Sequence, residues 1–297
     1  MASIDLLDVT TADGLLLTGA LYPAAVSSHK LSGIDAVLMV HGNGVSFYSP
    51  YQRDFAARLA AMGVAVLAAN NRGNGMVTPA VRPAGGPPAY IGTSLERIDE
   101  CVPDLDAWLD LLRSRGHERI LLWAHSRGAV KAAYYLATTR VTGVAAAVLS
   151  SPPLFSHQRW LASARGEEFK GMLARCADAV TRGEPDTLVP VTVPLPYLSG
   201  AAQYLDTYGP QERYNLLALL ERIDIPVLAT TGSIESTTML PYIGLPELLD
   251  AHAAQTGRFE HFLVEGADHV YTGRRVQVLE QVRAWLARQE LGFTQPS

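Results

Sequence analysis

The sequence predicts an α/β fold built on a mostly parallel, eight-stranded sheet flanked by helices. Apolar stretches of strand length alternate with amphipathic stretches of helix length, an order typical of parallel sheets with right-handed crossovers. Residues 35–40 and 64–69 are apolar at nearly every position, as strands buried on both faces usually are. The chain has 297 residues, of which 48% are hydrophobic and 18% charged, so it can bury a large core.

Eight segments share the length and the apolar content of strands, and they lie at residues 4–10, 15–21, 35–40, 64–69, 120–123, 144–149, 226–231 and 259–264. The first two are expected to pair as an antiparallel hairpin, because Ala12-Asp13-Gly14 between them is a turn sequence. Most of the later strands are separated by helical patterns, so we expect them to be parallel.

Five segments carry apolar side chains at helical spacing, and they lie at residues 55–62, 98–112, 129–136, 169–180 and 276–286. Gly63, Gly116 and Gly183 follow three of them and are expected to end those helices. A further helical segment is expected from about residue 211. Residues 70–92 form a long loop rich in glycine and proline, and loops of this length are usually functional or mobile.

The alternation of strands and helices breaks between residues 152 and 221. This block contains one clear helix pattern, the proline-punctuated apolar stretch 188–198 and no clear buried strand. We therefore expect a core domain formed by residues 1–151 and 222–297, with residues 152–221 inserted as a helical lid. The alternative is a peripheral helical excursion.

Charge and composition exclude several classes of partner. The net charge is −5 and no basic cluster occurs, so we expect neither nucleic acid nor membrane as a partner. No apolar run reaches the roughly 18 residues of a membrane span, and the first residues do not resemble a signal peptide. Cys101 and Cys176 are expected to be reduced, as in a cytoplasmic protein. We expect a small-molecule substrate, while monomer and homodimer both remain open.

The stretch that indicates chemistry most directly is the junction around Ser126. It lies where strand 120–123 gives way abruptly to helix 129–136, with the small residues Ala124 and Gly128 two positions away on either side. A serine nucleophile on a tight strand-to-helix elbow needs this spacing, because small neighbours let the turn close and expose the hydroxyl. The alternative role for Ser126 is a helix N-cap.

Polar residues follow the other predicted strands directly. In a parallel sheet the carboxyl ends of the strands line one crevice, so these residues can meet. They are His41-Gly42-Asn43-Gly44, Asn70-Asn71-Arg72-Gly73, Ser126-Arg127, Gly232-Ser233-Ile234-Glu235 and Gly266-Ala267-Asp268-His269. A serine, a carboxylate and an imidazole therefore fall at one edge, in that chain order.

At these positions the chain resembles the α/β-hydrolase superfamily, in its serine-nucleophile branch of esterases, lipases and peptidases. The motifs that carry the resemblance are the His-Gly at 41–42, the Arg-Gly at 72–73, the elbow at 124–128 and the Gly-x-Asp-His at 266–269. The resemblance covers nearly the whole chain apart from the inserted block. Two departures are Ala124 in place of the usual glycine and Glu235 where aspartate is commoner, and neither disables the chemistry.

The resemblance implies a two-step acyl transfer. Ser126 would attack a carbonyl, His269 would take its proton, and Glu235 would orient the imidazole. The oxyanion would be held by the backbone N–H groups of Arg127 and Asn43, although Asn43 could donate from its side chain instead. Asp268 remains the alternative acid. No metal and no organic cofactor is implied.

The expected substrate is a carboxylic ester or thioester of a medium-sized apolar small molecule. A serine nucleophile disfavours the haloalkane dehalogenase and epoxide hydrolase reactions, which need an aspartate. Non-hydrolytic acyl transfer, elimination or cyclisation in natural-product tailoring remain alternatives, as does a non-catalytic ligand-binding protein. The candidate pocket residues are aromatic and lie in loops or in the predicted lid: Tyr48, Trp160, Tyr197 and Tyr204. His41 and His125 are expected to be structural.

Overall fold

The computed structural model describes residues 4–26 and 31–289. Its eight-stranded sheet has the spatial order β1 (Asp5–Thr10), β2 (Leu16–Tyr22), β4 (Ala65–Ala69), β3 (Ala36–Val40), β7 (Ile120–His125), β8 (Val144–Ser150), β11 (Val227–Gly232) and β12 (Phe259–Val264). Strand β2 pairs antiparallel with β1 and β4, whereas all other neighbours pair parallel. The predicted mostly parallel sheet is therefore confirmed.

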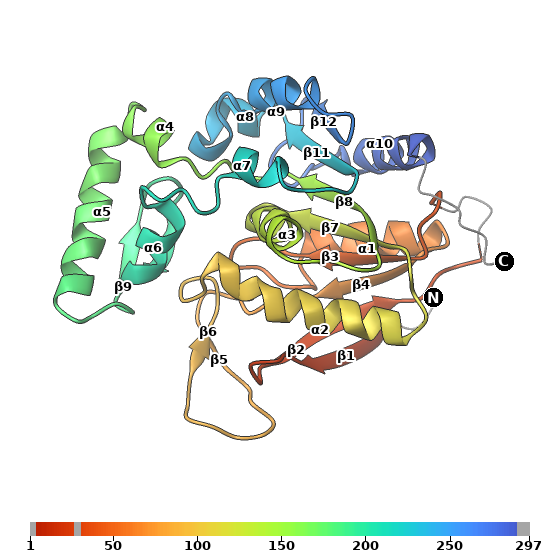
Figure 1. Cartoon of the computed structure of the whole chain (residues 1–297), viewed down its shortest axis with the longest axis horizontal. Helices are drawn as coiled ribbons and strands as arrows, with labels where there is room; N and C mark the ends of the chain where they lie inside the picture. Colours follow the sequence, from red (N-terminus) through yellow and green to blue (C-terminus); the bar gives the residue numbers. More distant parts are fainter. Residues whose placement is uncertain (1–3, 27–30, 290–297) are drawn as a thin grey trace.

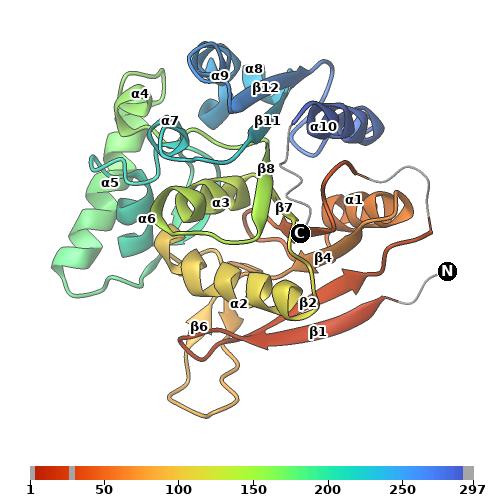
Figure 2. The same cartoon turned by 45° about the vertical axis from the view of Figure 1, so that its right-hand side comes forward.

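Helices cover both faces of this sheet (Figures 1 and 2). Side chains of a strand point alternately to its two faces, and in β3 Val37 and Met39 join one hydrophobic cluster while Leu38 and Val40 join the other. Helices α2 (Cys101–Ser114) and α3 (Arg127–Thr138) pack on one face, and α1 (Pro50–Ala61) and α10 (Arg275–Arg288) pack on the other. All residues of β3, β4 and β7 are buried, which explains their continuous apolar sequences.

Shorter elements complete the core. They are the two-residue strands β5 (Thr78–Pro79) and β6 (Tyr90–Ile91), the 3-10 helices η1 (Ile98–Glu100) and η2 (Leu240–Tyr242), and the helices α8 (Glu235–Thr238) and α9 (Leu245–Ala253). Strands β5 and β6 pair with each other inside the long loop that follows β4. The parallel strands all end at one edge of the sheet, so the residues that follow them are gathered there.

Most of the elements formed by residues 152–221 lie at one end of the molecule (Figure 1, left), whereas the last of them packs on α3. These elements are α4 (His157–Leu161), α5 (Gly166–Thr181), β9 (Leu188–Val191), β10 (Tyr197–Gly200), α6 (Ala201–Tyr208) and α7 (Leu216–Leu220). We refer to residues 152–221 as the inserted segment. Thr207 of this segment contacts Arg127 at the start of α3, so the segment reaches the elbow.

Two local expectations for the inserted segment were wrong. The proline-punctuated stretch forms a hairpin, because Val189 and Val191 are buried while the residues between and beside them are exposed, the alternation of a half-buried strand. No helix begins near residue 211. Instead α6 ends before Gly209-Pro210, which a helix does not readily cross, and α7 begins at Leu216. Within the described residues, no helix has the length and apolar character required to cross a membrane.

Candidate active site

Ser126 lies on a strained turn between β7 and α3. Its backbone has φ 57° and ψ −131°, a conformation that residues other than glycine rarely adopt. Its N–H donates to the carbonyl of Ser150, and this bond anchors the turn to the neighbouring strand. Gly128 is required here, because a Cβ at this position would lie 2.3 Å from the carbonyl oxygen of His41. The strand-to-helix elbow predicted from the sequence is thus present in the structure.

The loop after β3 presses directly against Ser126. A Cβ added to Gly42 would lie 2.8 Å from the Cβ of Ser126, which explains the glycine after His41. This approach places Asn43, the next residue, at the serine. The side-chain oxygen of Asn43 accepts a hydrogen bond from Thr93. Arg127, as the first residue of α3, has a backbone N–H with no acceptor inside the helix. Both residues therefore lie next to Ser126, one through the loop after β3 and one along the chain.

The structure brings Ser126, His269 and Glu235 into one hydrogen-bonded chain. The Oγ atom of Ser126 lies 3.0 Å from Nε2 of His269, which is 143 positions away in the sequence. Nδ1 of the same imidazole lies 2.6 Å from Oε2 of Glu235. With Nδ1 protonated, the imidazole donates to the carboxylate and its Nε2 accepts from the serine hydroxyl. This arrangement can remove a proton from Ser126 and hold the resulting imidazolium.

Glu235 is held by three donors from three segments of the chain, one of which is His269. Its Oε1 accepts hydrogen bonds of 2.7 Å from the N–H of Gly232 and from the hydroxyl of Ser151. The hydroxyl of Tyr271 lies 2.9 Å from Ser151 Oγ and donates to the carbonyl of Thr230. We call Ser151, Thr230, Glu235 and Tyr271 the acid-side network. All four residues are buried, so the carboxylate faces the imidazole in a nearly water-free surrounding.

Sequence reasoning missed Ser151 and Tyr271. Ser151 directly follows β8, so the rule that selected the residues after the other strands would also have selected it. It has φ 47°, a left-handed conformation that is costly for serine and that turns its hydroxyl toward Glu235. Tyr271 is two residues beyond His269 and carries no comparable signal.

Asp268 is engaged elsewhere. Its Oδ1 accepts hydrogen bonds from the N–H groups of Val270 at 3.1 Å and Thr272 at 2.9 Å, and these bonds stabilise the turn after β12. The structure thus places Glu235, and not Asp268, on the imidazole of His269.

Two buried histidines brace the site through backbone carbonyls. His125 donates from Nε2 to the carbonyl of His269 at 2.8 Å, and its ring stacks on Tyr51 with a centroid distance of 4.1 Å. His41 lies 2.9 Å from the carbonyl of Gly42 through Nδ1 and accepts the N–H of Asn71 through Nε2. Burial lowers the pKa of His125 well below its ordinary value and that of His41 to about 4, so both are neutral.

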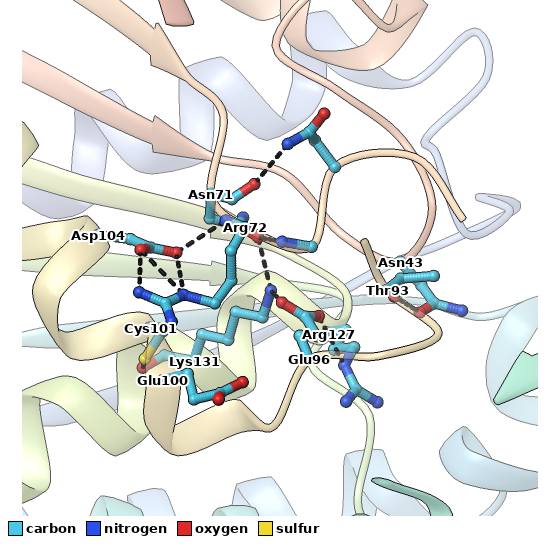
Figure 3. A network of polar contacts seen from close by, with 12 residues as sticks. Asn43, Asn71, Arg72, Thr93, Glu96, Glu100, Cys101, Asp104, Arg127 and Lys131 are labelled. Carbon is cyan, nitrogen blue, oxygen red and sulfur yellow. Dashed lines mark hydrogen bonds and ion pairs between the residues drawn. The ribbon is translucent and has the colours of Figure 1, made fainter. Parts of the chain in front are cut away.

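A cluster of buried charges lies beneath the elbow (Figure 3). Glu96 accepts from Nζ of Lys131 and, at 3.2 Å, from Nε of Arg127, while Lys131 also donates to Asn71 at 2.6 Å. We call Asn71, Glu96, Arg127 and Lys131 the elbow-side cluster. Burial alone would raise the pKa of Glu96, but Lys131 and then Arg127 hold it below its ordinary value. Gly73 makes room for this carboxylate, since a Cβ there would lie 2.2 Å from it.

The neighbouring arginine in this loop has a separate partner. Arg72 binds the buried carboxylate of Asp104 at 2.8 Å and the half-exposed carboxylate of Asp13 at 3.0 Å. These bonds tie the loop after β4 to α2 and to the first hairpin. The Arg-Gly motif of the sequence is therefore a structural device, in which arginine fixes the loop and glycine admits Glu96.

The four candidate pocket aromatics are in different surroundings. Tyr48 is 64% exposed and packs edge-on against Phe47. Trp160 and Tyr204 are buried in the interior of the inserted segment, where both contact Phe169. Tyr197 is partly buried. In the described part of the chain, no ring contact or hydrogen bond of these four side chains reaches Ser126, Glu235 or His269. The described part of the chain includes no cluster of three or more His, Cys, Asp or Glu residues that could hold a metal ion.

Comparisons with known proteins identify the family and the fold. A family model described as serine aminopeptidase, S33, matches residues 34–190, more than half of the chain. No curated protein sequence matches.

Several solved structures are similar. The α/β hydrolase GrgF from Penicillium sp. sh18 has 17% identity and a TM-score of 0.69, with 97% of this chain and 99% of that chain covered. Est1E from Butyrivibrio proteoclasticus has 15% identity and a TM-score of 0.61, with 97% and 99% covered. The esterase Pf2001 from Pyrococcus furiosus has 19% identity and a TM-score of 0.59, with 98% and 94% covered. At such identities the likeness shows the fold alone.

Proposed function

The chain belongs to the serine aminopeptidase S33 family of α/β hydrolases, and on this premise we propose that it cleaves a carboxylic ester or thioester of a medium-sized apolar small molecule. The observation that carries the proposal is the chain of hydrogen bonds from Ser126 through His269 to Glu235, with lengths of 3.0 and 2.6 Å. A serine on a strained elbow, with an oriented imidazole in contact, is the arrangement that acyl transfer requires.

The reaction proceeds through an acyl-enzyme. His269 takes the proton of Ser126 as Oγ attacks the carbonyl carbon, and Glu235 stabilises the imidazolium that forms. The N–H groups of Asn43 and Arg127 hold the oxyanion, and such donors contribute about 3 kcal/mol each in comparable sites. The imidazolium then protonates the leaving oxygen. A water molecule, deprotonated by the same imidazole, attacks the acyl-enzyme and releases the acid.

The surroundings of Ser126 favour an ester over the substrate of an aminopeptidase. An aminopeptidase must bind the free ammonium group of its substrate, and a carboxylate is the usual partner for such a cation. The buried carboxylates beside the elbow are already committed, because Glu96 binds Lys131 and Arg127 while Glu235 binds His269. An uncharged ester demands no such partner.

The inserted segment is proposed to act as a lid that selects the acyl group. Two contacts support this role: Nη2 of Arg127 donates to Thr207 of α6 at 3.3 Å, and the N–H of Gly200 donates to the carbonyl of Ser94 at 2.7 Å. Its interior is rich in aromatic side chains, which suits a cover that excludes water from an apolar substrate.

A fluorophosphonate probe and a panel of esters of increasing acyl length test the proposal together. The parent protein should be labelled and should hydrolyse part of the panel, whereas Ser126→Ala should do neither and keep its melting temperature. A parent that is not labelled and cleaves no ester refutes the proposed function. Tyr197→Ala should alter the preferred acyl length, and it is a better probe of the lid than Trp160, which is packed inside the segment. An unaltered preference removes the lid from the proposal.

A further inference from the structure

Backbone strain gathers around the site. Among the described residues other than glycine, positive φ angles occur at Ser126, Ser151, Glu212 and Tyr271. The first is the elbow serine, and the second donates a hydrogen bond to Glu235. Such strain persists only where the surrounding structure enforces it, and it is common at functional sites. Tyr271 shares the strain and the location, yet the reaction steps described above do not use it.

The conformation of Tyr271 is costly. A φ of 54° is a genuine outlier for a bulky side chain, whereas glycine or asparagine adopts such an angle more readily. The N–H of Tyr271 donates to the carbonyl of Asp268 at 3.1 Å, so the chain turns immediately after His269. This turn directs the ring into the core, where it is 0% exposed. The contacts of the side chain must therefore offset the strain.

The hydroxyl of Tyr271 joins two neighbouring strand ends. It lies 2.8 Å from Oγ1 and 2.9 Å from the carbonyl of Thr230 in β11, and 2.9 Å from Oγ of Ser151, which follows β8. A carboxylate is a stronger acceptor than a phenol, so Ser151 gives its proton to Glu235, at 2.7 Å. Burial and then Glu235 raise the pKa of Tyr271 well above its ordinary value, so the phenol keeps its own proton.

The loop that carries His269 is attached on both sides of the imidazole. Before it, the carbonyl of Ala267 accepts from the N–H of Ile234 at 3.0 Å. After it, the hydroxyl of Tyr271 reaches Thr230. Both attachments join the loop of the base to β11 and the residues directly after it, which carry the acid.

We propose that Tyr271 is a positioning residue that fixes the contact between the imidazole of His269 and the carboxylate of Glu235. This inference rests on the proposed function. The side chain is too deeply buried to touch a substrate, so it acts through other residues. It holds the loop of the base against β11, and it supports Ser151, which holds the acid. The 2.6 Å bond between Nδ1 and Oε2 depends on both of its carriers being held in place.

The test uses Tyr271→Phe, which removes the hydroxyl and keeps the ring. We measure kcat and KM on a p-nitrophenyl ester that the parent cleaves. We expect kcat to fall about tenfold, as for the loss of one hydrogen bond, and KM to stay within about twofold, because the side chain touches no substrate. The rate of labelling by fluorophosphonate should fall in parallel, since it depends on the same activated Ser126.

A second measurement separates positioning from a purely structural role. Tyr271→Phe is repeated in a Glu235→Gln protein, in which there is no carboxylate contact left to fix. There we expect kcat to change by less than about twofold, because a residue that acts through another loses its effect once the other is gone. A loss of the same size in both backgrounds would show that the hydroxyl acts independently of Glu235 and would overturn the proposal.

Tyr135→Phe is the matched control. Tyr135 is 2% exposed and lies nine positions after Ser126, and its hydroxyl donates to Asp106. This variant should unfold at a lower temperature than the parent and keep the parental kcat.

Thr230→Val is a second probe of the same contact, because it removes the hydroxyl that meets Tyr271 and keeps the shape of the side chain. Should Tyr271→Phe fail to fold, the Thr230→Val protein should lose kcat, and this loss should vanish in the Glu235→Gln background. An equal loss in both backgrounds overturns the proposal here too.

Parental kcat in Tyr271→Phe, or a raised KM with unchanged kcat, overturns the positioning role and leaves the proposed function intact. A parent protein that cleaves no ester and is not labelled by fluorophosphonate would instead overturn the proposed function, and the role of Tyr271 with it.

Discussion

Two buried carboxylates lie near Ser126, and their partners differ in kind. Glu96 in the elbow-side cluster is surrounded by two cations, Lys131 and Arg127 (Figure 3). Glu235 in the acid-side network receives hydrogen bonds from a hydroxyl and a backbone N–H, with no fixed cation on it. A carboxylate whose charge is already balanced gains little from a further positive charge. Glu235 can therefore stabilise a transient imidazolium, whereas Glu96 can only hold structure in place.

The comparison shows why burial alone does not identify a catalytic carboxylate. Both side chains are almost completely buried, at 1% exposure for Glu235 and 2% for Glu96. What distinguishes them is the kind of partner. Neutral hydrogen-bond donors fix the orientation of a carboxylate and leave its negative charge unchanged, whereas a paired cation balances that charge.

The largest expected effect on kcat is that of replacing Glu235, the carboxylate without a paired cation. Glu235→Gln should lower kcat by up to about 10⁴-fold, because the amide no longer orients and stabilises the imidazole. The kcat of Asp268→Asn should stay close to that of the parent, since the carboxylate of Asp268 accepts hydrogen bonds from two backbone N–H groups of its own turn. Steady-state kinetics on an ester that the parent cleaves provides the measurement. The reverse ranking would transfer the role of the acid to Asp268.

Glu96→Gln should give the opposite pattern, with a large cost in stability and a small one in turnover. Removing one partner of a buried ion pair typically costs about 3–5 kcal/mol, and here two cations are left without their anion. Denaturant unfolding measures this loss, and kcat of the folded fraction should change by less than about tenfold. A stable Glu96→Gln protein with a thousandfold lower kcat would contradict the division between the two carboxylates.

Variants of Ser151 test whether its hydrogen bond positions the carboxylate of Glu235. Ser151→Ala should lower kcat by about tenfold, because Glu235 loses one donor while the other two remain. Ser151→Gly should lower kcat equally but be the more stable variant, since glycine adopts φ 47° without strain. Thermal unfolding and kinetics of the pair separate the two effects. If both variants retain parental kcat, the hydroxyl does not position Glu235.

The most gradual effect is the acid sensitivity of the elbow-side cluster. The pKa of Glu96 is held below its ordinary value of 4.5 by Lys131 and Arg127. A depressed pKa means that its stabilising contribution is complete above about pH 4.5 and is lost as the pH falls through the folded-state pKa. The difference in unfolding free energy between the parent and Glu96→Gln should therefore narrow below pH 4. A difference that stays constant down to pH 3 would show that the pairing does not depend on the charge of Glu96.

Local patterns sufficed for the sheet and for the residues at its edge. Most of the central strands are continuous apolar runs, and Ser126, Glu235 and His269 each follow a predicted strand, so their common location follows from the parallel arrangement. The elbow could be identified because its backbone requires small residues at fixed spacing. These features depend on the nearest few residues only.

Features that depend on distant contacts could not be predicted in this way. Glu96 and Lys131 are 35 positions apart on elements whose facing sides only the packed structure defines. The ring of Tyr242 lies against the imidazole of His269 because η2 folds there, and an isolated Leu-Pro-Tyr sequence does not specify this. The strands of the inserted segment were missed because their prolines obscured the alternation of buried and exposed residues.

The hydrogen bond from His125 to the carbonyl of His269 has a mechanical consequence. It joins the strand that carries Ser126 and the loop that carries the imidazole into one unit, although 144 positions separate the bonded residues. Because this bond holds the main chain and not the ring, the orientation of the imidazole is set separately, by the bond from Nδ1 to Glu235. Displacement of the inserted segment would leave this tether untouched.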